Sequence, residues 1–221
     1  MLVVFDLDGT LIDSRRDLAD AANALIIELG GQPLAVDDVS RMVGEGAAML
    51  VRRALTASRL PGVSVAAALE RFLALYDERL LAHTRLYDGV ADVLRELSRD
   101  HALGLLTNKP LGATRQILDG LQIASFFQCV LGGDGPHPRK PDPAGLLQIV
   151  ERADAAVNQT TMVGDSAIDL ATARAAGCAA CLAKYGFGYR DDLPLRGDEL
   201  IAGTPRDILT LLNRTSDRDA R

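Results

Sequence analysis

Two aspartates separated by a single residue follow the first apolar run of the chain, in MLVVFDLDGT. The carboxylates of Asp6 and Asp8 repel each other when both are ionised, so we expect cationic partners beside them. Clustered carboxylates offer hard oxygen ligands, which suit a hydrated magnesium ion that also accepts a phosphate oxygen. The opening segment therefore directs attention to metal-assisted phosphate chemistry.

Further polar groups lie at or just after the ends of other apolar runs, or in the loop that follows one. They are Thr107 with Asn108, Lys140, and Asp165 with Asp169. Ligands bind at the carboxyl edge of open parallel sheets, so we expect these residues to converge on Asp6 and Asp8. Asp165 would complete a metal site, and Lys140 and Thr107 would contact phosphate.

Other phosphate chemistries lack their signatures in this sequence. The chain has no G-x-x-x-x-G-K-[ST] loop, and no cysteine has an arginine six residues later. The histidines His83, His101 and His137 lie away from the aspartate-bearing strand ends. An aspartate remains as the candidate nucleophile, because phosphoaspartate formation is an established covalent route.

The elements that position these residues are predicted from apolar runs that are continuous rather than alternating, as in strands buried on both faces. Helical patterns separate the later runs, which indicates crossover units and a Rossmann-like parallel α/β sheet. The expected strands are 2–5, 102–107, 128–132, 160–164 and 179–183, and the expected helices are 90–99, 112–121, 143–153 and 166–176.

A stretch without strands interrupts this alternation at 14–86 and predicts an inserted helical module. Ser14 and Asp17 approximate a capping box for its first helix. We expect a core formed by 1–13 and 87–213 and a flexible polar tail at 214–221. The further helices of the module are expected at 37–43, 46–58 and 64–82.

Composition narrows the function classes. A net charge of -6 and a pI near 5.1 argue against nucleic-acid and membrane-surface binding. We see no signal-like leader and no membrane-length apolar run, and the three cysteines form no disulfide framework, so we expect a cytoplasmic protein. Cys178 and Cys181 have C-x-x-C spacing but lie in an apolar run that reads as a buried strand.

Four segments, FDLDGT, LTN, RKPDP and GDSAID, together resemble the four ordered motifs of the haloacid dehalogenase-like superfamily of phosphohydrolases and bracket residues 5–169. The resemblance implies that Asp6 attacks phosphorus and that Asp8 serves as the general acid and base. It also implies that Thr107 and Lys140 bind phosphoryl oxygens, with Gly9, Thr10 and Asn108 near the substrate. Mg²⁺ would be held by the carboxylates of Asp6 and Asp165 and the backbone carbonyl of Asp8, with Asp169 and Ser166 adjacent.

The helical insertion resembles the C1 cap of that superfamily, with hinges expected near 12–16 and 82–88. Its segment RMVGEGAAMLVRRAL is similar to the cap loop of phosphoglycolate phosphatases, which suggests substrate contacts from Arg41, Gly44, Glu45 and Gly46. Arg41 would either recognise a substrate carboxylate or pair with Glu45. Asp13 would either tune the site or form a turn.

These features predict a Mg²⁺-dependent phosphomonoesterase that acts on a small phosphorylated metabolite, with 2-phosphoglycolate as the first choice. Sugar-phosphate phosphatase, pyrophosphatase and beta-phosphoglucomutase activities use the same motifs and stay open. A non-catalytic metabolite binder would not need both Asp6 and Asp8, and a phosphorylated signalling domain would not need Asp8 or the cap. We expect a monomer or a homodimer.

Overall fold

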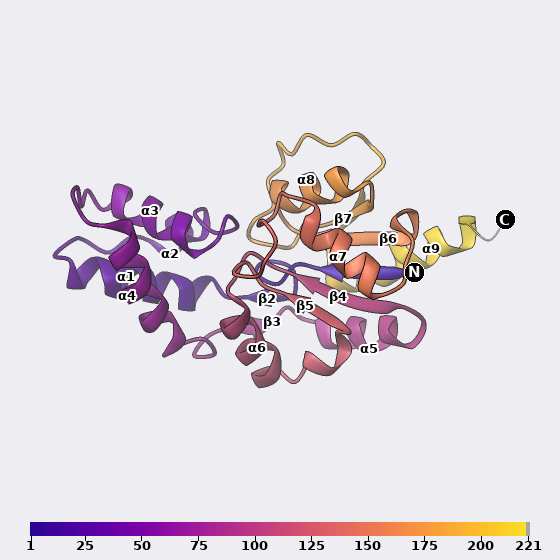
Figure 1. The fold of residues 1–221 in the computed structure, drawn as a ribbon, viewed down its shortest axis with the longest axis horizontal. Coiled ribbons are helices and arrows are strands. Elements are labelled where there is room, and N and C mark those ends of the chain that lie inside the picture. The colour runs from indigo at the N-terminus through magenta and orange to yellow at the C-terminus, as the bar shows by residue number, and fades with distance from the viewer. Residues whose placement is uncertain (220–221) are drawn as a thin grey trace.

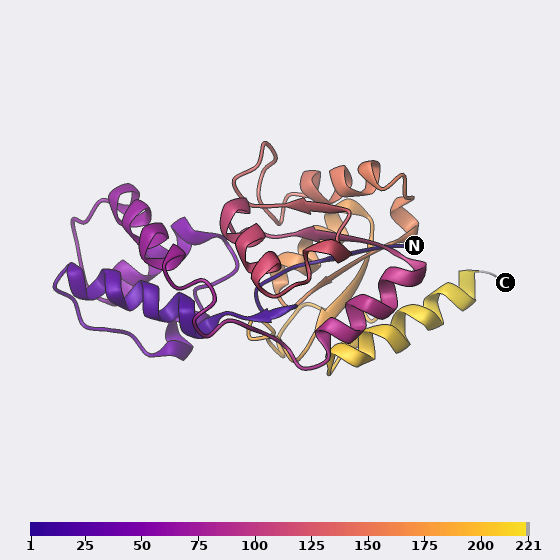
Figure 2. The same cartoon turned by 90° about the horizontal axis from the view of Figure 1, so that it is seen from below.

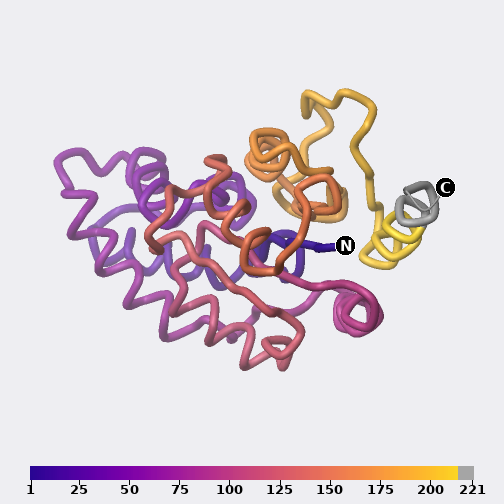
Figure 3. The backbone as a smooth tube through the Cα atoms, turned by 45° about the vertical axis from the view of Figure 1, so that its right-hand side comes forward, coloured from indigo at the N-terminus to yellow at the C-terminus, as the bar shows by residue number. Residues whose placement is uncertain are grey.

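The computed structural model describes the backbone of residues 1–219, in which an α/β core carries a helical cap at one end (Figure 1). The core is built on a six-stranded parallel sheet of order β5-β4-β1-β6-β7-β8. Figure 3 shows the start of the chain, in indigo, lying between later segments of the core. The strands are β1 (Leu2–Phe5), β4 (Ala102–Leu106), β5 (Cys129–Leu131), β6 (Thr160–Gly164), β7 (Ala179–Ala183) and β8 (Leu200–Ala202).

Side chains of the central strand β1 alternate between two separate apolar clusters. Val3 and Phe5 join the cluster that includes the buried faces of α5, α6 and α9, whereas Leu2 and Val4 join the cluster of α7 and α8. Figure 2 shows α5 and α9 running beside each other on one face. Covering both faces explains the continuous apolar run and confirms the predicted sheet. These helices are α5 (Val90–Asp100), α6 (Leu111–Gly120), α7 (Ala144–Arg152), α8 (Ala167–Ala176) and α9 (Pro205–Asp219).

Four helices form the cap. The first, α1, contacts α2, α3 and α4, and α3 packs on α4. The three-and-four spacing of apolar residues in α1 buries Leu18, Ala22, Leu25 and Ile26 against these partners. The cap helices are α1 (Arg15–Glu28), α2 (Val36–Ser40), α3 (Ala47–Ala57) and α4 (Val65–Asp77).

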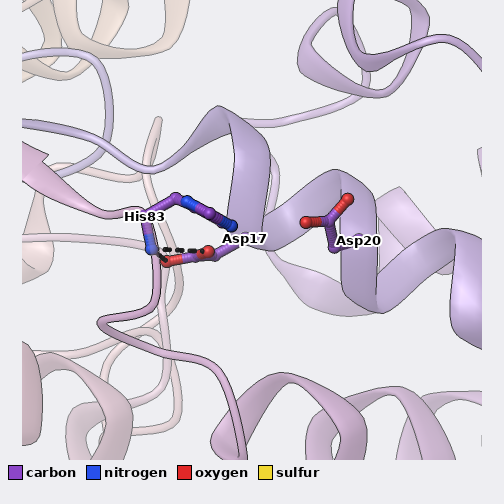
Figure 4. A group of neighbouring side chains, drawn as sticks. All are labelled: Asp17, Asp20 and His83. Atoms are coloured by element: carbon purple, nitrogen blue, oxygen red, sulfur yellow. Dashed lines mark hydrogen bonds between the residues drawn. The ribbon is translucent and has the colours of Figure 1, made fainter.

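Two short strands join the cap to the core. β2 (Ile12–Asp13) pairs antiparallel with β3 (Arg85–Leu86), so both connections run next to each other. The buried carboxylate of Asp17 accepts hydrogen bonds from the backbone amides of His83 and Thr84 at 2.8–2.9 Å, and the His83 bonds are dashed in Figure 4. The carboxylate of Asp17 thus fastens the first cap helix to the returning strand.

The expected capping box at the start of α1 is wrong. Ser14 makes no capping hydrogen bond, and Asp17 faces the returning strand instead. A capping box does form at α8, where the Ser166 hydroxyl accepts from the Asp169 amide and the Asp169 carboxylate accepts from the Ser166 amide. The local pattern was the same at both sites, and tertiary partners decided which pair closed.

The chain beyond residue 183 holds two elements that the sequence analysis did not predict, β8 and α9. β8 is a three-residue strand, too short for a periodicity signal, whereas α9 begins at Pro205, a residue suited to the first helical turn. The bounds of α9 include 214–219 of the expected tail, and residues 220–221 lie outside the described part of the chain. Among the described residues, no helix has the length and apolar character needed to cross a membrane.

Candidate active site

The carboxyl ends of three neighbouring strands supply the centre of the site. Asp6 follows β1, Thr107 follows β4 and Asp165 follows β6, and all three line a cavity of about 60 Å³. Because parallel strands end at the same edge, adjacency in the sheet brings together residues up to 159 positions apart. The cap closes the opposite side of the cavity, chiefly with the loop that precedes α3 and with α4.

Lys140 lies between two carboxylates of this centre. Its Nζ atom is 2.8 Å from Asp6 Oδ1 and 2.6 Å from Asp169 Oδ1, and the side chain is 3 % exposed. Burial alone would lower the pKa of Lys140, but the charges of Asp169 and Asp6 outweigh it and raise the pKa above its ordinary value. The site therefore contains a fixed positive charge next to Asp6.

Three buried carboxylates lie close together near the ammonium group of Lys140. Oxygens of Asp6, Asp165 and Asp169 lie within 4.8 Å of one another. Burial, opposed by Lys140 and reinforced by Asp169, raises the pKa of Asp6 to about 7. Burial, followed by the charges of Asp169 and Asp6, raises the pKa of Asp165 well above its ordinary value. Such an excess of hard, mutually repelling oxygen donors fits a divalent cation.

The cluster members differ in how much of each carboxylate is already engaged. Asp169 receives Lys140 on one oxygen and the Ser166 hydroxyl, at 2.6 Å, on the other. Asp165 accepts the Gly188 amide at 2.7 Å and has no lysine or arginine within 4.0 Å among the described residues. Asp165 is accordingly the member best placed to bind a metal, and Asp169 orients Lys140.

Asp8 points to different partners from those of Asp6, although only Leu7 separates them. The Ser14 hydroxyl donates to its carboxylate at 2.5 Å, and Lys109 Nζ lies 2.9 Å from both carboxylate oxygens. The two carboxylates thus pair with separate lysines, Asp6 with Lys140 and Asp8 with Lys109. Their mutual repulsion, which the sequence posed as a problem, is met by two cations rather than one.

Gly9 and Thr10 support this arrangement without lining the cavity. Gly9 has a φ of 88°, and a Cβ built there would lie 1.9 Å from Asp165 Oδ2. Only glycine allows both that backbone conformation and that approach. The carbonyl of Thr10 accepts the Tyr185 hydroxyl at 2.8 Å, which ties the loop to the segment after β7.

Asn108 lines the cavity, and its side-chain amide is already hydrogen-bonded within the protein. Its Nδ2 donates to the carbonyls of Gly44 and Lys140, both at 2.9 Å, and its Oδ1 accepts the Lys140 amide. The side chain amide therefore joins the loop after β4 to the Lys140 loop and to the cap. Gly44 and Gly46 do line the cavity, as expected of the cap loop.

The structure does not bring Arg41 and Glu45 to the cavity, and the alternative in which the two pair with each other is wrong. Arg41 pairs with Asp38, and Glu45 pairs with Arg53. Their side chains are 60 % and 42 % exposed. Helix α2 ends at Ser40, before the expected residue 43, so Arg41 lies at a helix end facing solvent. Asp13 likewise turns to Arg15, which lowers the pKa of Asp13 through a hydrogen bond.

Sequence reasoning missed Lys109 and the aromatic residues Tyr76 and Phe187, which also line the cavity. Lys109 could have been noticed from composition, because the chain has only three lysines, Lys109, Lys140 and Lys184. Tyr76 carried no comparable signal, since its place on the buried stripe of α4 is equally typical of a core residue.

Comparisons with known proteins agree with this geometry. A family model described as haloacid dehalogenase-like hydrolase matches residues 3–183. A phosphoglycolate phosphatase of Pseudomonas putida is 40% identical over 213 residues, covering 94% of this chain and 78% of the relative. One of Rhodospirillum rubrum is 43% identical, covering 84% of this chain and 80% of the relative.

The solved structures include a crystal structure described as a predicted phosphoglycolate phosphatase from Haemophilus somnus 129PT. It has a TM-score of 0.89 and 29% identity, and the match covers 95% of this chain and 96% of that one. The family match spans most of the chain, and the matched residues include the aspartates, the lysine and the cap just described. The protein is therefore a member of the haloacid dehalogenase-like hydrolase family.

Proposed function

We propose that this hydrolase is a Mg²⁺-dependent phosphomonoesterase that cleaves 2-phosphoglycolate through an aspartyl-phosphate intermediate. The observation that carries the proposal is that Asp6 and Asp8 both line the cavity but have different partners. Asp6 lies at the junction of the acidic cluster and the cavity, 2.8 Å from Lys140. Asp8 also lines the cavity but is held by Ser14 and Lys109.

In the first step, a carboxylate oxygen of Asp6 forms a bond to phosphorus as the ester P–O bond breaks. Asp8 in its protonated form gives a proton to the departing alkoxide, so that an alcohol leaves. In the second step, Asp8 takes a proton from water while the water oxygen attacks phosphorus. The bond from phosphorus to Asp6 then breaks, which releases inorganic phosphate and restores the free Asp6 carboxylate.

Lys140 and Thr107 support both steps by binding phosphoryl oxygens. The ammonium group of Lys140 is fixed by Asp169 at 2.6 Å, so it needs no reorganisation as negative charge accumulates. Asn108 holds the backbone of Lys140 in the same place. The buried hydroxyl-bearing residue Thr107 lies at the end of β4 and faces the same cavity.

The residues that would hold Mg²⁺ are Asp6, Asp165 and the backbone carbonyl of Asp8. The acidic cluster supports this assignment because its three carboxylates are matched by one lysine alone. When bound, the ion neutralises the phosphate and helps align it with Asp6. Asp169 is excluded from this set because Lys140 and Ser166 occupy its oxygens.

Two features support 2-phosphoglycolate as the substrate. The matches to the two relatives named phosphoglycolate phosphatase cover 78% and 80% of the relatives' length, at 40% and 43% identity. The cap also lines its side of the cavity with apolar side chains, which favours a short ester over a hexose phosphate with many hydroxyl groups. All three cysteines are free thiols, which supports a cytoplasmic location. The oligomeric state, monomer or homodimer, stays a prediction.

A panel of phosphate monoesters assayed with Mg²⁺, with EDTA and with Asp6→Asn tests the proposal. We expect Asp6→Asn to lower kcat by about 10,000-fold, since it removes the nucleophile, and EDTA to abolish turnover. Asp191→Asn, whose carboxylate is 89% exposed, is the matched control and should behave as the wild type. Turnover that survives Asp6→Asn would refute the covalent step, and a higher kcat/KM for hexose phosphates would refute the substrate.

A further inference from the structure

Lys109 is a second buried lysine in the cavity, and none of the steps above uses it. Its side chain is 4 % exposed, and its Nζ contacts both oxygens of Asp8. Burial would lower the pKa of Lys109, but the charge of Asp8 outweighs it and keeps the lysine protonated. An ammonium group has three N–H donors, so the contacts with Asp8 leave donor capacity for a ligand.

Tyr76 of α4 lies against this lysine. The Nζ of Lys109 is 4.7 Å from the centre of the Tyr76 ring, and Tyr76 is 3% exposed. Within the described residues, the Tyr76 hydroxyl makes no hydrogen bond of good geometry, although the Lys109 ammonium group lies close enough to act on the pKa of Tyr76. A buried hydroxyl without a partner has lost its hydration with nothing in return, and both residues line the cavity. Tyr76 is thus a donor available for a bound group.

The other side chains that the cap presents to the cavity cannot bind a charge. They are the apolar side chains of Leu18, Val43, Leu50, Phe72 and Leu73, and Gly44 and Gly46 contribute backbone alone. Lys140, the other cation of the cavity, is committed to Asp6 and Asp169 at the phosphoryl end. Apart from Lys109 and Tyr76, a negatively charged substituent on the cap side would meet only apolar side chains in the part of the chain that the structure describes.

We propose that Lys109 Nζ and the Tyr76 hydroxyl form the subsite that binds the substrate's carboxylate and selects phosphorylated short hydroxy acids over neutral phosphate esters. The inference rests on the proposed phosphatase function and assigns its selectivity to two residues. Lys109 then links Asp8 to the substituent next to the scissile bond. The apolar wall around the pair strengthens both hydrogen bonds by excluding water.

The experiment compares 2-phosphoglycolate with ethyl phosphate, in which a methyl group replaces the carboxylate. The quantity measured is the ratio of the two kcat/KM values. We expect Lys109→Met to lower this ratio at least 30-fold relative to the wild type, chiefly through a higher KM for 2-phosphoglycolate. Tyr76→Phe should lower it about fivefold. Lys184→Met, at a lysine that is 54 % exposed, is the matched control and should leave the ratio unchanged.

The outcomes separate the subsite from the proposed function. If Lys109 only positions Asp8, both esters lose kcat together and the ratio stays at the wild-type value, which overturns the subsite. A wild type with no preference for 2-phosphoglycolate overturns the proposed substrate, and the subsite with it. Should Lys109→Met fail to fold, Tyr76→Phe carries the test, because it keeps the ring and the lysine; an unchanged ratio then refutes the subsite.

Discussion

The core and the cap line opposite walls of the cavity, and the two walls differ in the kind of side chain that they present. On the core wall, charged side chains contact each other at 2.6–2.9 Å, as Lys140 does with Asp169 and Lys109 does with Asp8. On the cap wall, α3 and α4 present Leu50, Phe72 and other apolar groups. The core wall fixes charge where bonds are made and broken, and the cap wall excludes water and leaves selection to a few polar groups.

This difference predicts that loss of charge in the core wall is severe. Lys140→Met should lower kcat by about 1,000-fold, because the phosphoryl oxygens lose a preorganised cation. It should also destabilise the fold by about 3 kcal/mol, since two buried carboxylates are left unpaired. Steady-state kinetics and urea unfolding measure the two effects.

Lys184→Met is the control for that variant, because the contacts of the Lys184 ammonium group are exposed, an ion pair with Asp191 at 3.5 Å and the Tyr189 ring at 5.6 Å. It should alter stability by no more than about 0.5 kcal/mol. If Lys140→Met retained kcat within tenfold of the wild type, the core wall would not depend on a fixed charge, and the contrast between the walls would fail.

A pair of glycines offers a smaller and more local comparison of the same walls. Gly9, which follows Asp8 behind the core wall, and Gly44 in the cap wall both have positive φ values, 88° and 119°. A Cβ at Gly9 would meet the Asp165 carboxylate at 1.9 Å, whereas one at Gly44 would meet the flexible end of Ile168 at 3.3 Å. The backbone strain is therefore shared, and the steric environment differs.

Gly9→Ala should destabilise the protein by about 3 kcal/mol and Gly44→Ala by about 1 kcal/mol, as measured by urea unfolding. The shared cost arises from the backbone conformation, and the difference comes from displacing a buried carboxylate. Equal losses would mean that Asp165 moves freely, which is incompatible with a preformed acidic cluster.

The sheet and the charged centre of the site could be predicted from the sequence for a physical reason. Residues such as Asp6, Thr107 and Asp165 end continuous apolar runs, and the geometry of parallel strands converts that local pattern into proximity. Lys140 was predicted from the RKPDP motif, although the loop that carries it has no periodicity of its own.

The partners of individual side chains could not be predicted in this way. Asn108 follows Thr107, a proposed phosphate contact, yet its amide joins three loops because the Lys140 backbone and the Gly44 carbonyl present matching groups to it. Arg41 faces solvent because Asp38, three residues earlier, is nearer than Glu45 in the folded chain. Such choices depend on tertiary neighbours that no local spacing specifies.

The most direct test of the central claim, that Asp6 carries the phosphoryl group, is to trap the phosphoenzyme. Asp8→Ala, mixed with Mg²⁺ and p-nitrophenyl phosphate, whose leaving group departs without a proton, and quenched in acid, should form the intermediate and retain it because the attacking water loses its base. Borohydride converts an acyl phosphate to an alcohol, and peptide mass spectrometry locates it. The account predicts homoserine at position 6 and none in the Asp6→Asn, Asp8→Ala double variant; a modified residue elsewhere would contradict it.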